Sequence, residues 1–351
     1  MTEIEHILEE TGLLYTSDAT PGYSREITNN GVVILSPSQQ IITDPKILDR
    51  IKKLAIPPAW KDVWIATKIN SHLQATGIDE AGRKQYRYHP EWSKSRNETK
   101  YFRLLEFGSK ISDFRKNIAK DLRRKNLDER KVLAISVNLM QKTLIRVGNE
   151  SYKQLYGSYG LTTLRDKHVQ FKGNQLKLSF KGKKGIYHEI SLTDKNLSKL
   201  VKKCRDIPGQ ELFQYYASNG ERRSIDSGMI NRYIKEVTCC DFTAKDFRTW
   251  AGTLNTLKEL SVQEYPETIT HRKKVIVSVL DQVSSKLGNT RAICKKSYVF
   301  PALLESYESG ELAPYLKKIS KASDIMGELG LNHDEKVLLN FLKVQRRKKS
   351  I

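Results

Sequence analysis

Apolar residues occur at two different spacings along the chain, and the spacing changes near residue 93. Ahead of this point, short apolar runs lie between turn-forming residues, which is typical of β-strands. The predicted strands cover residues 31–35, 63–67 and the two arms of a hairpin over 72–90. Between them, Asp44 is a suitable N-cap and Pro45 a suitable first residue for a helix that ends at Pro57. We therefore expect a small, strand-rich α+β domain over residues 1–92.

Beyond residue 93 the apolar residues recur at helical spacing. The predicted helices cover residues 98–124, 128–148, 194–204, 227–237, 244–260, 272–287 and 336–351, the last running into a basic tail. Gly148 is expected to end the second helix, because glycine takes the left-handed conformation at a helix C-terminus without strain. Alternating apolar and polar residues over 168–192 predict a small embedded β-sheet. The expected fold class is therefore α+β, with a larger, mainly helical domain over residues 93–351.

The net charge of the chain indicates what kind of partner it binds. The chain has 351 residues, with 61 Lys and Arg against 40 Asp and Glu, and its formal net charge at pH 7 is +21. The excess is spread along the chain, so the folded surface is expected to attract a polyanion, of which nucleic acid is the commonest. Hydrophobic residues make up 38% and charged residues 29%, a balance that argues against wholesale disorder.

Several classes of protein are disfavoured by what the sequence lacks. No apolar run reaches the length of about 18 residues that a membrane span needs. The acidic N-terminus, MTEIEHILEETG, is not a secretory signal. The four cysteines form no zinc-binding pattern and are expected to be free thiols in a reducing compartment. Since there is no Gly-rich phosphate loop and no HExxH motif, an enzyme acting on phosphate is expected to need no ATP, metal or other cofactor.

Four residues could together carry phosphodiester chemistry. Arg146 follows an apolar run, and Arg248 lies among aromatic and small residues in KDFRTWAGT. Lys183 lies on a glycine-flanked hairpin, FKGKKG, and Tyr298 follows two lysines in KKSYVFP. Arginine binds non-bridging phosphate oxygens, lysine can protonate a leaving alkoxide, and tyrosine can form a covalent phosphoester. Taken singly, each residue also fits a structural role: a salt bridge, a solvated turn or a packed ring.

At these residues the sequence resembles the poxvirus-type DNA topoisomerase IB family, in its bacterial-like branch, and the resemblance covers most of the chain. IPPAWKDVWI and GRKQYRYHPEW resemble the N-terminal domain of that family. LIRVGNESY and LTTLRDKHV resemble its first arginine block, FKGKKGIYHEI its lysine hairpin, KDFRTWAGT its second arginine block and SYVFP its nucleophile block. These blocks in this order are a specific signal, whereas any one of them alone is weak.

The resemblance implies a catalytic role for each matching residue. Tyr298 would attack a DNA phosphodiester and become joined to the 3′ phosphate. Arg146 and Arg248 would stabilise the five-coordinate transition state, and Lys183 would protonate the departing 5′ oxygen. Many family members place a histidine nine residues before the tyrosine, where this chain has Asn289. An amide can still donate a hydrogen bond to a phosphate oxygen, although it cannot be cationic.

The resemblance also implies DNA contacts outside the catalytic residues. Gln85, Tyr86 and Tyr88 match the family's major-groove and backbone contact positions, and Tyr152 matches a further contact. Glutamine reads base edges and tyrosine reaches phosphates, which suits these roles. The alternative interpretation of QYRY is an ordinary strand with two alternating faces.

The sequence therefore predicts a type IB DNA topoisomerase that closes around double-stranded DNA as a monomer. It would nick one strand, let supercoils relax by rotation and reseal the nick without ATP, because the phosphotyrosyl ester keeps the energy of the broken bond. The expected location is the cytoplasm, with nucleoid association in a bacterium, or the virion or viral factory of a virus.

Two alternatives belong to other classes of protein. A site-specific tyrosine recombinase shares the helical catalytic fold and the chemistry, but recombinases usually carry His-x-x-Arg where this chain has Lys245 three residues before Arg248. A catalytically inactive DNA-binding protein is disfavoured, because the two arginines, the lysine and the tyrosine are all present.

Overall fold

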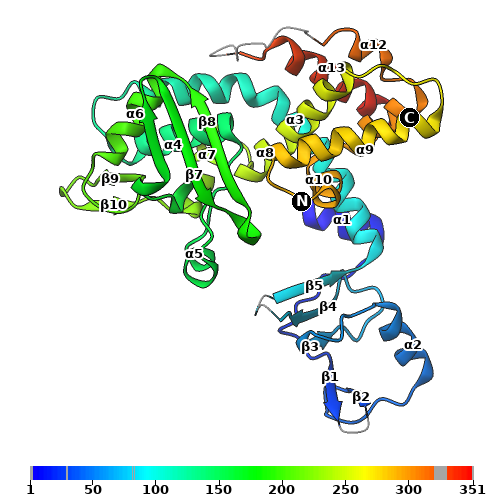
Figure 1. The fold of residues 1–351 in the computed structure, drawn as a ribbon. Helices are drawn as coiled ribbons and strands as arrows, with labels where there is room; N and C mark the ends of the chain where they lie inside the picture. The colour runs from blue at the N-terminus through cyan, green and yellow to red at the C-terminus, as the bar shows by residue number, and fades with distance from the viewer. Residues whose placement is uncertain (1–2, 29–30, 81, 83, 320–329, 350–351) are drawn as a thin grey trace. The chain divides into compact units, whose positions relative to one another are not determined.

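The computed structural model describes residues 3–28, 31–80, 82, 84–319 and 330–349 (Figure 1). The chain folds into two compact units, Met1–Tyr101 (unit 1) and Phe102–Ile351 (unit 2). The division falls inside helix α3 (Pro90–Leu122). The functional boundary expected between residues 92 and 93 stays a prediction.

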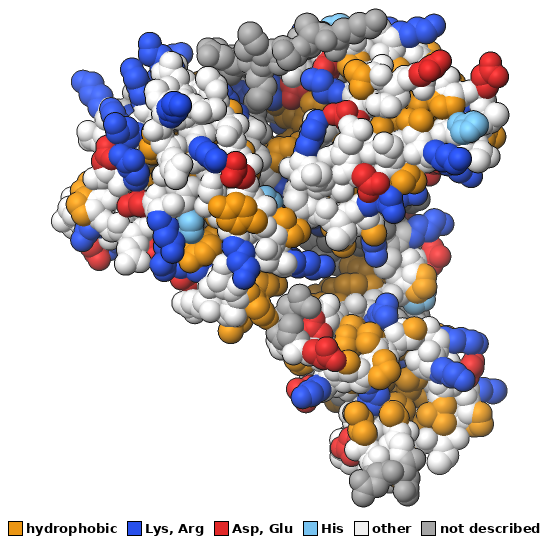
Figure 2. Space-filling model, viewed as in Figure 1, with side chains coloured by type: hydrophobic (Ala, Val, Ile, Leu, Met, Phe, Trp, Pro, Cys, Tyr) orange, Lys and Arg blue, Asp and Glu red, His pale blue; other side chains and the backbone are white. Residues whose placement is uncertain are grey.

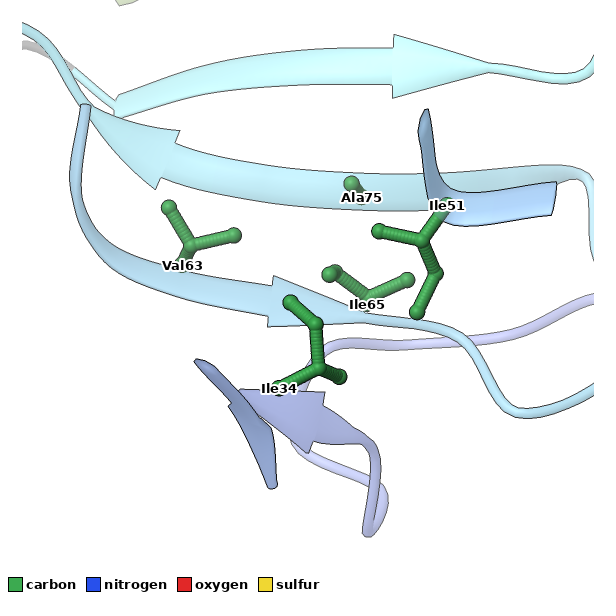
Figure 3. Close-up of a cluster of buried hydrophobic side chains, with 5 residues drawn as sticks. All are labelled: Ile34, Ile51, Val63, Ile65 and Ala75. Carbon is green, nitrogen blue, oxygen red and sulfur yellow. The ribbon is translucent and has the colours of Figure 1, made fainter. Parts of the chain in front are cut away.

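Unit 1 is built on an antiparallel sheet with the strand order β2-β1-β3-β4-β5. Its elements are α1 (Glu3–Thr11), β1 (Tyr23–Thr28), β2 (Gly31–Leu35), α2 (Pro45–Lys53), β3 (Lys61–Ile65), β4 (Leu73–Ile78) and β5 (Lys84–Tyr88). Asp44 caps α2 as expected, since its side chain accepts a hydrogen bond of 2.8 Å from the Lys46 backbone N–H. Figure 3 shows the apolar cluster that joins α2 to the sheet; its residues are Ile34, Ile51, Val63, Ile65 and Ala75.

Unit 2 is mainly helical, and its elements fall into a sheet-bearing group and a group of packed helices. The first group contains α4 (Glu129–Thr143), α5 (Glu150–Tyr156), β6 (Val169–Lys172), β7 (Gln175–Lys181), β8 (Tyr187–Thr193), α6 (Lys195–Arg205), β9 (Gln214–Tyr216), β10 (Arg222–Ser224) and α7 (Ser227–Thr238). The second group contains α8 (Ala244–Ser261), α9 (Ile269–Lys286), α10 (Arg291–Tyr298), α11 (Pro301–Ser309), α12 (Ala313–Leu316) and α13 (His333–Lys349). These elements confirm the predicted fold class.

The sheet β6-β7-β8 carries the β7–β8 hairpin, and helices α4 and α6 pack against its strands. Leu176, Leu178 and Phe180 alternate along β7 and are buried, because α4 and α6 pack against this part of the chain (Figure 1). β7 and β8 pair in register from Gln175 to Lys181 without a bulge. The β7–β8 turn that follows is therefore presented on a rigid support. Figure 2 shows Lys and Arg side chains spread over this part of unit 2.

Buried carboxylates fix the last described helix to the rest of unit 2. Glu335 of α13 accepts two hydrogen bonds of 2.8 Å from Arg115 of α3, and both side chains are buried. Asp334 pairs with Lys258 of α8 at 2.8 Å. Breaking one member of a buried pair leaves an uncompensated charge, so α13 is an integral part of the unit.

The predicted helix over residues 128–148 is wrong at its C-terminal end. α4 ends at Thr143, and Leu144 takes a left-handed conformation, with φ of 57°, as the C-cap. The apolar pattern continues past this point only because Ile145 is buried by tertiary packing. Arg146 therefore lies in a loop and not on a helix.

Candidate active site

The loop that carries Arg146 is fixed by contacts with a short 3₁₀ turn, η1 (Leu161–Thr163). The Leu161 backbone N–H donates to the Arg146 carbonyl oxygen at 2.8 Å. Gly148 has φ of +95°, and a Cβ on Gly160 would lie 2.5 Å from the Gly148 Cα. Only glycines allow the two segments to approach this closely, so the RVG stretch is rigid although it is not helical.

The Arg146 guanidinium binds the segment between α9 and α10. Its Nη2 donates to the Gly288 carbonyl oxygen at 2.9 Å and to Asn289 Oδ1. Burial lowers the pKa of Arg146, the neighbouring Arg248 lowers it further, and the Tyr298 hydroxyl acts in the opposite direction. The two arginines and the tyrosine are therefore near neighbours.

Arg248 projects from α8 into the same place and is only 5% exposed. Its Nη2 donates to the Leu287 carbonyl oxygen at 2.7 Å, and its Nη1 donates to the Leu144 carbonyl oxygen. The guanidinium carbon lies 5.0 Å from the centroid of the Tyr298 ring. In the described part of the chain no ion pair joins Arg146 or Arg248 to a carboxylate. The site therefore keeps two positive charges that no protein anion neutralises.

Tyr298 is the last residue of α10, and its backbone packs on α8. A Cβ on Gly252 would lie 2.4 Å from the Tyr298 carbonyl oxygen, so glycine is required at this contact. The fully buried Thr253 hydroxyl accepts from the Phe300 backbone N–H at 3.2 Å and lies 3.3 Å from the Tyr298 carbonyl oxygen. The backbone that follows the tyrosine, from its own carbonyl oxygen to the Phe300 N–H, is thus held by one helix.

Lys183 lies on the β7–β8 turn, as predicted. The Gly182 backbone N–H donates to the Ile186 carbonyl oxygen at 2.7 Å and closes the turn. The Lys183 Nζ lies 5.6 Å from the centroid of the Tyr152 ring, on α5. A small pocket is lined by Arg146, Lys183 and Arg248, among other residues. The lysine hairpin and the two arginines therefore face the same hollow.

The side-chain amide of Asn289 has one hydrogen-bond donor without an acceptor among the described residues. Its Oδ1 accepts from Arg146, while its Nδ2 is buried and has no hydrogen-bond partner in the described residues. The Nε of Arg248 is likewise buried and has no hydrogen-bond partner in that part of the chain. Buried donors of this kind are rare in folded proteins and mark places where a ligand can complete the hydrogen bonding.

Three of the four predicted DNA-contact residues belong to β5 of unit 1. Tyr86 and Tyr88 stack, with ring centroids 6.0 Å apart, and they are 48% and 44% exposed. Gln85 lies on the opposite face of the strand, where its Nε2 donates to Asp79 Oδ2 at 2.9 Å. The fourth, Tyr152, belongs to unit 2 and lies beside Lys183.

No group of three or more His, Cys, Asp or Glu side chains that could hold a metal occurs among the residues that the structure describes. The four cysteines are free thiols, as expected. Burial raises the pKa of Cys294, which lies on α10 near Tyr298, to about 11. This thiol is therefore protonated at neutral pH and unreactive.

Family models match both units of the chain. A model described as the catalytic core of eukaryotic DNA topoisomerase I matches residues 89–325, and one described as the N-terminal domain of bacterial DNA topoisomerase IB matches residues 34–79. The chain belongs to the type IB DNA topoisomerase family. The predicted family and the predicted DNA topoisomerase function are thereby confirmed.

Viral type IB topoisomerases are among the similar proteins. The chain is 32% identical to DNA topoisomerase 1B of Acanthamoeba polyphaga mimivirus over 271 residues, which cover 75% of this chain and 81% of the viral protein. It is 23% identical to DNA topoisomerase 1B of vaccinia virus (strain Western Reserve) over 279 residues, or 77% of this chain and 82% of the viral protein. These matches favour a topoisomerase over a recombinase.

Two residues of this type IB topoisomerase contact the candidate catalytic segments although the sequence did not indicate them. Thr253 follows Gly252 in WAGTLN, and a small pair at this point of a helix indicates close packing of a second segment. His188 lies inside the lysine block FKGKKGIYHEI, and its ring lies against Gly182 and Gly288. No spacing in the sequence connects residue 188 to residue 288, so only the fold could reveal that contact.

Proposed function

We propose that Tyr298 is the nucleophile with which this topoisomerase cleaves one DNA strand. In the proposed step the tyrosine hydroxyl gives up its proton, its Oη bonds to phosphorus, and the bond from phosphorus to the 5′ oxygen breaks. The observation that carries the proposal is the Arg248 guanidinium 5.0 Å from the Tyr298 ring, with Arg146 beside both.

The two arginines are proposed to stabilise the transition state of this step. Charge develops on the non-bridging oxygens of the five-coordinate phosphorus, and preorganised donors in a buried place stabilise it without reorganising. Arg146 and Arg248 are held by carbonyl oxygens, so a phosphate meets guanidiniums that are already oriented. The unpartnered Nδ2 of Asn289 is proposed to donate to the same oxygens.

Lys183 is proposed to be the general acid that protonates the departing 5′ oxygen. An arginine is effectively never deprotonated and makes a poor proton donor, which leaves the lysine for this role. Its turn lies at the edge of the hollow that the arginines line. Religation reverses the step: the 5′ hydroxyl attacks the phosphotyrosyl ester, and the free energy held in that ester replaces ATP.

DNA is proposed to be held by both units of a single chain. Tyr86 and Tyr88 would contact the DNA from unit 1, and Tyr152 would contact it from unit 2. Gln85 would reach a base only by leaving Asp79, so its contribution includes the cost of that hydrogen bond. The exposed, stacked tyrosines support the proposal, because tyrosine hydroxyls suit contacts with a phosphate backbone.

The substitution Tyr298→Phe tests the proposed nucleophile. It removes one oxygen and keeps the ring under Arg248, so we expect normal DNA binding, no covalent adduct and no relaxation of supercoiled plasmid. The assays are denaturing electrophoresis of labelled duplex DNA with the protein, and plasmid relaxation with a chelator and without ATP.

Tyr307→Phe is the matched control. The Tyr307 hydroxyl is buried and has no hydrogen-bond partner in the described residues, so its loss should change neither adduct nor relaxation. Adduct formation by Tyr298→Phe at the normal rate would show that another tyrosine is the nucleophile.

A monomer is expected in sedimentation at the concentrations used for relaxation, and a dimer there would contradict the single-chain clamp.

A further inference from the structure

The imidazole of His188, on β8, is enclosed by groups from two separate parts of unit 2. It stacks on Phe180 of β7, with ring centroids 5.1 Å apart and planes 17° apart. A Cβ on Gly182 would lie 2.5 Å from its Cδ2, and a Cβ on Gly288 would lie 2.2 Å from its Cε1. The ring therefore fills the space between these two glycines.

Each of the two glycines adjoins a catalytic candidate. Gly182 precedes Lys183, and its N–H closes the β7–β8 turn on Ile186. Gly288 accepts the Arg146 hydrogen bond of 2.9 Å and precedes Asn289. The His188 ring is thus the contact through which the lysine turn rests on the segment that holds the arginine and the asparagine.

The surroundings of the ring are cationic. Arg146 from the loop after α4 and Arg248 from α8 face it, and Lys183 and Lys286 line the same small pocket. Burial lowers the pKa of His188, and the two arginines lower it further, so the imidazole is neutral at pH 7. Neither ring nitrogen hydrogen-bonds to a group in the described part of the chain, so the ring acts here by its shape.

We infer that His188 is a positioning residue for Lys183, which sets the distance between the lysine turn and the scissile phosphate. The inference rests on the proposed role of Lys183 as general acid. Removing the ring opens a gap between Gly182 and Gly288 and leaves the turn without its support on that side. The ammonium then samples positions that are too far from the 5′ oxygen, and proton transfer slows.

His188→Ala is therefore expected to slow cleavage of ordinary duplex DNA by about 10–100-fold, a part of the ~10²–10⁴-fold that a general acid supplies. A substrate whose 5′ bridging oxygen is replaced by sulfur has a leaving thiolate that needs no proton. On that substrate we expect His188→Ala to cleave within about 3-fold of the unsubstituted protein, because only proton transfer is impaired.

Two reference variants define the scale of this experiment. Lys183→Ala should be slow on ordinary DNA and fast on the sulfur substrate, while Arg248→Ala should be slow on both. Leu176→Ala is the matched control for general loosening, because it opens a cavity in the same sheet at the end away from the turn. It should lower the melting temperature without slowing either cleavage reaction. His188→Gln, which refills part of the gap, should restore part of the rate on ordinary DNA.

The outcomes separate the inference from the function on which it rests. If Lys183→Ala is rescued by the sulfur substrate and His188→Ala is not, His188 does not act through the lysine and the inference is overturned alone. If Lys183→Ala is equally slow on both substrates, the general-acid role fails and the inference fails with it. A His188→Ala variant that cleaves ordinary DNA at the full rate also overturns it. Where His188→Ala does not fold, His188→Gln is compared on the two substrates by the same criteria.

Discussion

Thr253 illustrates how much one buried side chain can do for the nucleophile. Its hydroxyl lies 3.0 Å from the Thr249 carbonyl oxygen of its own helix and 3.3 Å from the Tyr298 carbonyl oxygen, and it accepts from Phe300. The residue is fully buried, so no water competes for these bonds. The backbone just after the tyrosine is therefore tied to α8, the helix that also carries Arg248.

His168 gives the protein a predictable sensitivity to acid. Its ring is buried against Tyr159, its Nδ1 accepts from the Arg165 backbone N–H at 3.0 Å, and burial together with Lys167 and Arg165 lowers its pKa from 6.5 to about 4. The unfolded chain binds this proton first as pH falls. The contribution to stability is thus fully present above pH 6.5 and is lost as the pH falls through about 4, and it amounts to at most about 3 kcal/mol.

Chemical denaturation between about pH 4 and pH 7.5 measures this effect. The free energy of unfolding of the unsubstituted protein should fall over that interval more steeply than that of His168→Gln, which has no group to titrate there. His188 has its own lowered pKa and contributes to both curves equally, so the difference between them belongs to His168. Parallel curves for the two proteins would refute the prediction.

At the scale of elements, the contact between α8 and α10 sets the position of the nucleophile. Gly252→Ala would place a methyl 2.4 Å from the Tyr298 carbonyl oxygen, and the end of α10 would have to move. We expect cleavage to slow by about 10-fold or more, since small displacements of reacting groups are costly, and the free energy of unfolding to fall by about 1–3 kcal/mol.

The control for Gly252→Ala is the same change at Gly330. No described atom lies within 4 Å of a Cβ at Gly330, so Gly330→Ala should cleave DNA at the normal rate. Alanine is favoured over glycine inside a helix by about 1 kcal/mol, so a loss of stability in Gly252→Ala would come from the contact and not from helix propensity. A stabilised and fully active Gly252→Ala protein would show that α10 adapts without cost.

The elements also show where sequence pattern is sufficient and where it is not. The sheet around Lys183 was predictable, because Leu176, Leu178 and Phe180 alternate along a strand that glycines terminate. The end of α4 was not, because Leu144 turns the chain by adopting a left-handed conformation that its side chain does not signal. α10 is too short for its periodicity to stand out, although its Thr290 cap is visible in the sequence.

The candidate site, too, has residues that the sequence indicated and contacts that only the fold shows. The residue types and their order along the chain carried the resemblance, and the fold places Arg146, Arg248 and Tyr298 together. The contacts of His188 and Thr253 depend on segments about 100 and 45 residues away in sequence, and a single sequence holds no record of such pairings. The split of Gln85 and Tyr86 onto opposite faces follows from strand alternation and was visible beforehand.

At the scale of the whole molecule, we expect the net charge of +21 to govern the affinity for DNA. If about 6–10 phosphates are contacted, the affinity should fall by about 10³–10⁵-fold between about 50 and 200 mM salt, because bound counterions are released from the DNA. Fluorescence anisotropy of a labelled duplex with Tyr298→Phe measures binding without cleavage. A nearly flat plot of log K against log salt would mean that contacts other than phosphate pairing dominate.

No helix in the described part of the chain is long and apolar enough to cross a membrane. The four lysines of α6, Lys195, Lys199, Lys202 and Lys203, are all exposed, so charge is not confined to the pocket that the two arginines and Lys183 line. The salt dependence of binding therefore reports on the surface as a whole, whereas the rate of cleavage reports on the site.

Arg146 and Arg248 rest on carbonyl oxygens, and among the described residues neither forms an ion pair with a carboxylate, so we expect the protein to be less stable without DNA than with it. The repulsion between the two arginines and the unfilled hydrogen bond of the Arg248 Nε oppose folding, and a phosphate bound beside them would offset the repulsion and accept that hydrogen bond. Because a ligand that binds only the folded state stabilises it, we expect DNA to protect the chain against heat and proteolysis. The lifetime of such a protein in a cell would then follow its occupancy, so that molecules engaged on DNA persist and idle ones are removed.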